Sequence, residues 1–243
     1  MITFIFPIYN QEHVIEKSIT HLVQHLSEYL EEKYEILICI DGSPDNCLQI
    51  ANDLSEKLEH VKSIGYSKNK GRGHAIKYAG LLHAQGDYII YMDCDLVQDK
   101  YIKYINTMIE KVRDNDVVVA SRFLPTSNTA RKWQRKIISK VYRILIKIIF
   151  FGFKVKDPDV GFKGFKKECF HKVNLVCNLN GPSWDLQFLV NAQTEGYQIL
   201  EFPFQYIEDY EKTTTNIFYY SLVEFLGLVY IKITCIISKY INF

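Results

Sequence analysis

The chain has 243 residues, of which 48% are hydrophobic, enough to bury one large core or two small ones. Its six cysteines show no C-x-x-C spacing, which argues against a zinc site or a disulfide framework and fits a reducing cytosol. The net charge of +1 is unevenly distributed: residues 122–172 hold 14 Lys and Arg against 3 Asp and Glu, a net of +11, so the rest carries −10. That segment favours an anionic partner, such as an acidic membrane surface, a phosphorylated acceptor or nucleic acid.

The first half of the chain alternates apolar β-rich runs with runs of helical period. No basic segment precedes the first run, so we expect no cleaved secretory signal. The strands are predicted at 2–9, 35–41, 61–67, 87–93 and 117–122, and helices near 13–31, 46–58, 73–85 and 100–113. This alternation predicts an α/β fold, with a mostly parallel, Rossmann-like sheet flanked by helices.

Polar residues follow three of these strands where each one ends. Ligands of open α/β sheets bind outside the carboxyl ends of the strands, so residues 7–10, Asp41 and residues 93–95 are expected on one rim. Asp93 and Asp95 follow an apolar strand one residue apart. Hard cations such as Mg²⁺ or Mn²⁺ prefer carboxylate oxygens and retain sites for substrate phosphate. The pattern therefore predicts a metal-bound diphosphate, against the alternative of an ordinary acidic turn.

The pattern changes after Arg122. Residues 131–150 form one predicted helix, in which Lys136, Lys140, Arg143 and Lys147 make a cationic stripe beside a broad apolar face. This is typical of a helix lying in an anionic membrane surface, although a helix packed on the protein with solvated lysines is also consistent with it. The tail, 216–243, is apolar but interrupted by charges, which favours a second membrane-surface helix over a true span or a docked tail.

Several motifs, in their order along the chain, resemble those of family 2 glycosyltransferases of the GT-A fold. They are Phe6-Pro7-Ile8-Tyr9-Asn10, Asp41-Gly42-Ser43, Asn69-Lys70-Gly71-Arg72-Gly73 and Asp93-Cys94-Asp95. Ser121-Arg122, the basic helix, Asp157-Pro158-Asp159-Val160-Gly161-Phe162-Lys163-Gly164-Phe165 and Trp184-Asp185 are similar to the branch that makes polyprenyl-phosphate sugars, the dolichyl-phosphate mannose and glucose synthases. We expect a glycosyltransferase domain over 1–213 and a membrane-associated or docked C-terminal helix over 214–243.

The resemblance implies roles for individual residues on the donor side. Nucleotide-binding candidates are Pro7, Tyr9, Asn10, Asp41, Arg72, Asp93 and Lys212. Pro7 and Tyr9 would line the base pocket and Asp41 would accept a hydrogen bond from the base, unless it is a turn former. Arg72 adds positive charge at a helix start suited to phosphate. Asp93 and Asp95 would hold the Mg²⁺ or Mn²⁺, with Asp95 as the firmest ligand.

On the acceptor side, the resemblance points to two further acids and three arginines. Asp157 would orient the sugar or its cationic neighbours, and Asp185 would have an acceptor-side or base-like role, so that Asp95, Asp157 and Asp185 are the catalytic candidates. A turn former and a helix cap are the structural alternatives for Asp157 and Asp185. Arg122, Arg131 and Arg135 are the candidates for binding the lipid phosphate, because a guanidinium matches phosphate oxygens.

The resemblance thus implies an inverting, metal-dependent transfer of a hexose from a GDP- or UDP-linked sugar to a polyprenyl phosphate at the cytoplasmic face of a membrane. The same donor chemistry with a glycan hydroxyl as acceptor, in capsule or surface polysaccharide synthesis, is the alternative. A non-catalytic module that binds membranes or nucleic acid through the basic segment is an alternative of another class, with nucleic acid disfavoured as a partner. The oligomeric state, including a homo-oligomer, is left open.

Overall fold

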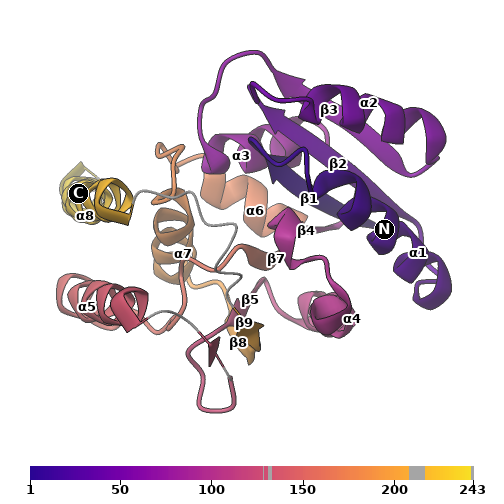
Figure 1. Ribbon diagram of the computed structural model, residues 1–243. Helices are drawn as coiled ribbons and strands as arrows, with labels where there is room; N and C mark the ends of the chain where they lie inside the picture. Colours follow the sequence, from indigo (N-terminus) through magenta and orange to yellow (C-terminus); the bar gives the residue numbers. More distant parts are fainter. Residues whose placement is uncertain (128, 131–132, 208–216, 242–243) are drawn as a thin grey trace.

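The computed structural model describes residues 1–127, 129–130, 133–207 and 217–241 (Figure 1). Its main sheet has the order β3-β2-β1-β4-β7-β5-β8. The strands are β1 Ile2–Ile8, β2 Tyr34–Asp41, β3 Val61–Tyr66, β4 Tyr88–Met92, β5 Val117–Ser121, β7 Phe162–Lys166 and β8 Ile199–Pro203. A second, two-stranded sheet pairs β6 Thr129–Ala130 with β9 Tyr206–Ile207.

The helices are α1 Ile15–Tyr29, α2 Cys47–Lys57, α3 Arg72–Leu82, α4 Asp99–Asp114, α5 Trp133–Ile149, α6 Lys167–Asn174, α7 Trp184–Thr194 and α8 Ile217–Ile241. The α/β class and the mostly parallel sheet are confirmed, and the predicted strands and helices agree with the structure to within a few residues. Among the described strands of the main sheet, β7 alone runs antiparallel to its neighbours, pairing with both β4 and β5. Its insertion between two parallel strands was not predicted.

Helices cover both faces of the sheet. Neighbouring residues of a strand point to opposite faces, and on β7 the backbone of Gly164 meets α4 while Phe165 packs against α6 and α7. His25 of α1 is hydrogen-bonded to Asn106 of α4 at 2.9 Å, which places α1 on the α4 face. Every residue of β1 and β2 is buried, as expected for central strands enclosed on both sides.

Helix α7 joins two hydrophobic clusters. Trp184 and Phe188 belong to the main core, whereas Leu186 and Val190 belong to a second cluster with side chains of α5 and α8. Asp185 lies between these residues on the same helix. Apolar side chains lie on several sides of α7, and the helix is buried continuously from residue 184 to residue 190, so protein encloses it.

Helices α5 and α8 lie side by side at the end of the molecule away from α1 and α2 (Figure 1). Tyr142 and Ile146 of α5 pack with Leu228 and Ile231 of α8. The Lys232 ammonium donates to the carbonyl of Ile149 at 2.8 Å, where a cation is favoured at the end of α5. The predicted domain boundary at 213–214 lies outside the described residues.

Much of the α5–α8 pair remains exposed to solvent. Its exposed apolar side chains are Trp133, Ile137, Val141, Ile144, Ile148, Leu222, Phe225, Leu226, Val229, Tyr230, Ile233, Ile236 and Ile237. Lys136, Lys140 and Lys147 are exposed on α5, as the sequence predicted. Arg143 is less exposed than these lysines, because its guanidinium lies 3.7 Å from the ring centre of Phe123. No helix within the described ranges is both long and apolar enough to cross a membrane.

Candidate active site

The carboxyl ends of β1, β2 and β4 meet at one edge of the sheet, because these strands are parallel neighbours. Pro7 is buried in β1, Tyr9 is half-exposed beyond it, and the Asn10 N–H donates to Ser43 Oγ at 2.7 Å. The backbone of Asn10 is in the left-handed region, with φ of 56°, which Asn tolerates better than most residues. The structure therefore brings the first two predicted segments of the rim together.

Asp41 is buried and holds the loop that leads into α3. Its carboxylate accepts hydrogen bonds from the N–H groups of Lys70 and Gly71, at 2.7 and 2.9 Å, and from the Asn69 side chain at 3.1 Å. A Cβ on Gly42, whose φ is 59°, would come within 2.3 Å of the Asn69 nitrogen, so the next residue has to be glycine. The predicted hydrogen bond between Asp41 and a nucleotide base would use carboxylate lone pairs of Asp41 that do not already accept from this loop.

Arg72, the first residue of α3, joins two of the predicted acids. Its guanidinium lies 2.5 Å from Asp185 Oδ2 and 3.4 Å from Asp93 Oδ2. The other oxygen of Asp185 accepts from the Lys163 ammonium at 2.6 Å and from the Tyr91 hydroxyl. We call Arg72, Tyr91, Asp93, Lys163 and Asp185 the charge cluster.

The charges in this cluster alternate, and their pKa values follow from the contacts. Burial acts to raise the pKa of Asp185, but Lys163 and Arg72 outweigh it and the pKa lies below its ordinary value. Burial raises the pKa of Asp93, with Arg72 opposing the shift. Asp185 is thus a stable carboxylate with its oxygens occupied, whereas ionisation of Asp93 is favoured by an additional cation.

The end of β4 has the donor set for a hard divalent cation. Asp93 is the last residue before the short helix η1, Cys94–Leu96, and Asp95 is exposed within it. A Cβ on Gly161 would lie 1.7 Å from Asp93 Oδ2, so glycine at this position leaves room for the carboxylate. The described residues contain no group of three or more His, Cys, Asp and Glu suited to a metal. Two acids fit a cation whose remaining ligands are water and substrate phosphate.

Asp157 and Arg122 form a separate, enclosed pair. Two guanidinium nitrogens of Arg122 donate to the two oxygens of Asp157 at 2.8 Å each, and the Arg122 backbone N–H donates at 2.7 Å. The arginine lowers the pKa of Asp157 against the effect of burial. This bidentate contact gives Arg122 a fixed protein partner, so its predicted contact with an acceptor phosphate remains a prediction.

Three predicted site residues have no described side chain. Arg131 and Lys212 lie outside the described residues, and Arg135 lies in α5 without a described side chain. The structure adds Tyr91, Lys163 and Asp159, to which the sequence assigned no role. Lys163 follows Phe162 in a strand-like run, and a lysine placed among core phenylalanines is a sequence signal for a buried, paired charge.

Several known proteins match this chain in sequence. The model of the family described as Glycosyl transferase family 2 matches residues 3–173. Glycosyltransferase AglD of Haloferax volcanii is 29% identical over 205 residues, which are 83% of this chain and 32% of that protein. Dolichyl-phosphate beta-glucosyltransferase ALG5C of Trichomonas vaginalis is 29% identical over 222 residues, 85% of this chain and 64% of the relative. The chain thus spans about a third of the Haloferax protein and somewhat under two thirds of the Trichomonas protein.

Solved structures share the fold. Glucosyl-3-phosphoglycerate synthase from Mycobacterium tuberculosis, in complex with Mn²⁺, UDP and glucosyl-3-phosphoglycerate, has a TM-score of 0.71 at 14% identity, over 95% of this chain and 79% of that one. Mannosyltransferase PcManGT from Pyrobaculum calidifontis, in complex with GDP-Man and Mn²⁺, has a TM-score of 0.59 at 16% identity, over 88% and 58% of the two chains. Both complexes contain Mn²⁺ and a nucleotide or nucleotide sugar.

Proposed function

The chain belongs to glycosyl transferase family 2, and we propose that it transfers one hexose, with inversion, from a GDP- or UDP-linked sugar to a polyprenyl phosphate at the cytoplasmic face of a membrane. The observation that carries this proposal is the position of Asp93 and Asp95 at the end of β4, with Arg72 beside Asp93. This corner combines carboxylates for a cation with a guanidinium for phosphate, as a nucleoside diphosphate requires.

The donor would lie across the edge formed by β1, β2 and β4. Tyr9 is half-exposed there and offers a ring to a base, and Arg72 retains a partly exposed guanidinium at the start of α3. Asp93 and Asp95 would hold the Mg²⁺ or Mn²⁺. When bound, such an ion neutralises charge on the departing diphosphate.

The acceptor oxygen would form the new bond to the anomeric carbon as the bond to the donor phosphate breaks. A phosphate monoester is largely ionised near neutral pH, because its second pKa is about 6, so its oxygen needs no general base. Asp185 suits this chemistry as a positioning group. It is 1% exposed, and its oxygens are held by Arg72, Lys163 and Tyr91.

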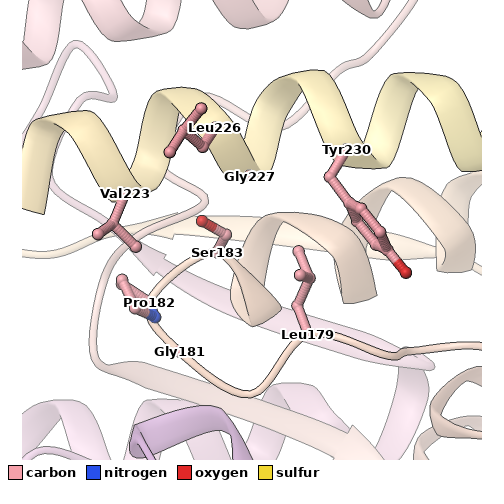
Figure 2. Close-up of a pocket in the computed structure, with 8 residues that line it drawn as sticks. All are labelled: Leu179, Gly181, Pro182, Ser183, Val223, Leu226, Gly227 and Tyr230. Carbon is pink, nitrogen blue, oxygen red and sulfur yellow. The ribbon is translucent and has the colours of Figure 1, made fainter.

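The α5–α8 pair supports a lipid acceptor. Its exposed apolar side chains and the lysines of α5 together have the composition of a surface that binds anionic lipid. An apolar pocket of about 350 Å³ lies between α8 and the loop before α7 (Figure 2). Ser183 lines this pocket two residues before Asp185. We place the first prenyl units of the acceptor there. The names of the dolichyl-phosphate relatives agree with a lipid phosphate.

The direct test is reconstitution. Purified protein with Mn²⁺ or Mg²⁺, UDP-glucose or GDP-mannose, and a polyprenyl phosphate in detergent or vesicles should yield a sugar lipid, detected by thin-layer chromatography and mass spectrometry. Asp95→Ala should abolish the product. Turnover unchanged by this substitution would contradict a role for a metal bound at Asp95. Transfer only to a glycan hydroxyl would establish the alternative acceptor.

A further inference from the structure

Lys163 is an ammonium enclosed in the core beneath the proposed donor site. Its side chain is 1% exposed, and Nζ lies 2.6 Å from Asp185 Oδ1 and 2.9 Å from the Tyr91 hydroxyl. A buried ammonium is costly unless a counter-charge and hydrogen-bond acceptors surround it, and here Asp185 and the Val160 carbonyl supply them. The position is therefore built around a charged lysine.

Asp185 divides its two oxygens between different partners. Lys163 and Tyr91 bind Oδ1, which leaves Oδ2 to Arg72. Because two donors hold Oδ1, the carboxylate is fixed in its rotation, and Oδ2 keeps one direction toward the guanidinium. Lys163, together with Tyr91, thus determines where the second oxygen points.

Arg72 is the member of this chain of contacts that reaches solvent. Its side chain is 28% exposed, whereas those of Asp185 and Lys163 are enclosed. A guanidinium has five N–H donors in a fixed plane. The contacts with Asp93 and Asp185 use one N–H on each terminal nitrogen, so the remaining donors are oriented by these two carboxylates.

We propose that Lys163 is a positioning residue for the donor: through Asp185 it fixes the guanidinium of Arg72 in the orientation that binds the nucleoside diphosphate beside Asp93. The inference rests on the proposed function, since it takes the diphosphate as the ligand of Arg72. Lys163 itself touches neither the donor nor the acceptor.

The net charge of the charge cluster predicts in which direction the loss of Lys163 changes ligand affinity. The cluster holds two cations, Arg72 and Lys163, and two acids, Asp93 and Asp185. Removal of the lysine leaves one excess negative charge, which opposes an incoming anion and favours a cation. Loss of Lys163 should therefore weaken binding of the nucleotide while leaving binding of Mn²⁺ alone unchanged or tighter.

The experiment is isothermal titration of the full chain with UDP and GDP in the presence of Mn²⁺, and separately with Mn²⁺ alone. Lys163→Met should weaken nucleotide binding roughly tenfold to a hundredfold, the range for one well-placed charge-assisted hydrogen bond. Lys166→Met is the matched control. It lies on the same strand, and its partner Asp116, at 3.3 Å, is outside the cluster. This variant should bind like the wild type.

A purely structural role for Lys163 would lower the melting temperature without changing the nucleotide Kd of the folded protein, and that result overturns the inference. If Lys163→Met does not fold, Lys163→Met/Asp185→Asn removes both charges of the buried pair. This folded double variant should still bind nucleotide weakly, because Arg72 has lost its anchor; wild-type affinity would contradict the inference. Wild-type protein that binds neither UDP nor GDP with Mn²⁺ contradicts the proposed function instead.

Discussion

Gly161 lies directly against the carboxylate of Asp93. A Cβ at this position would come 1.7 Å from Oδ2 and 2.6 Å from Oδ1, and the Gly161 carbonyl accepts a hydrogen bond from the Asp93 N–H at 2.7 Å. The antiparallel strand β7 begins at the next residue. The segment before β7 therefore determines where the first acid of the Asp-x-Asp motif can lie.

Gly161→Ala should displace the Asp93 side chain and weaken Mn²⁺-dependent nucleotide binding by roughly tenfold or more, the cost of about 1.4 kcal/mol or above. Titration calorimetry with Mn²⁺ and UDP or GDP measures this. Gly164→Ala is the control, because its Cβ would meet Met108 Sδ at 2.8 Å on the α4 side. That variant should lose stability and keep its affinity. Equal affinities for the Gly161 variant and the wild type would show that Asp93 is not constrained by this contact.

Arg122→Met should destabilise the fold by roughly 3–5 kcal/mol, because it leaves the enclosed carboxylate of Asp157 without its cation. The Asp157 side chain is 1% exposed and that of Arg122 is 14% exposed. Urea unfolding followed by circular dichroism gives the free energy. The double variant Arg122→Met/Asp157→Leu should recover part of the loss. A single variant as stable as the wild type would mean that the pair is not needed for folding.

Asp159 should make stability fall as the pH rises. Burial, with Glu224, Asp157 and Asp185, raises the pKa of Asp159 to about 8, and Lys163 opposes this shift. Since the folded pKa lies above the unfolded value of about 4, the stabilising contribution is complete below pH ~4 and is lost as the pH approaches 8. One oxygen of Asp159 is buried without a hydrogen-bond partner, which fits a protonated acid.

Asp159→Asn removes this titration. The difference in melting temperature, variant minus wild type, should therefore rise between pH 5 and pH 8 and stay nearly constant above pH 8, because the folded pKa is about 8. Differential scanning calorimetry across this range measures the difference. Asp114→Asn, at an exposed site on α4, controls for the loss of one carboxylate. A pH-independent difference for the Asp159 variant would contradict the prediction.

Neutralising exposed lysines of α5 should weaken binding to anionic vesicles by about fivefold per lysine, since each contributes about 1 kcal/mol near such a surface. Lys140→Gln and Lys147→Gln are the informative variants because both side chains are exposed. Sedimentation with phosphatidylserine-containing vesicles, repeated at high salt, measures binding. Lys17→Gln, exposed on α1 at the other end of the molecule, is the control (Figure 1). Equal effects of the α1 and α5 substitutions would count against a lipid-facing α5.

Local sequence pattern was sufficient for the alternating strands and helices and for the acids at the strand end. Asp93 and Asp95 could be placed at an edge because a strand delivers its last side chains there, and this requires only the apolar run before them. The same reasoning could not show that Asp41 holds the loop before α3, because that contact depends on how two strand ends approach in space.

The charge cluster was missed for a related reason. Arg72, Lys163 and Asp185 come from parts of the chain 22 to 113 residues apart, and no periodicity links them. Strand β7 carries Lys163 and Gly164 among its phenylalanines, and these two residues made the segment resemble a turn rather than a strand in the sequence. Helical spacing correctly grouped the lysines of α5, but it could not anticipate that the ring of Phe123 would lie beside Arg143 of the same stripe.

Helix α7 connects the outer helices α5 and α8 to the charge cluster through packed side chains. Leu186 and Val190 pack against side chains of α5 and α8, whereas Trp184 and Phe188 pack in the main core. Asp185 lies between these residues on the same helix. A tilt of the outer pair must therefore strain the backbone that carries Asp185, since close-packed interiors transmit displacement rather than absorb it. Binding of a ligand to the outer helices, or its release, would then alter the position of Arg72 through Asp185, although Arg72 has no described hydrogen bond to the outer helices themselves.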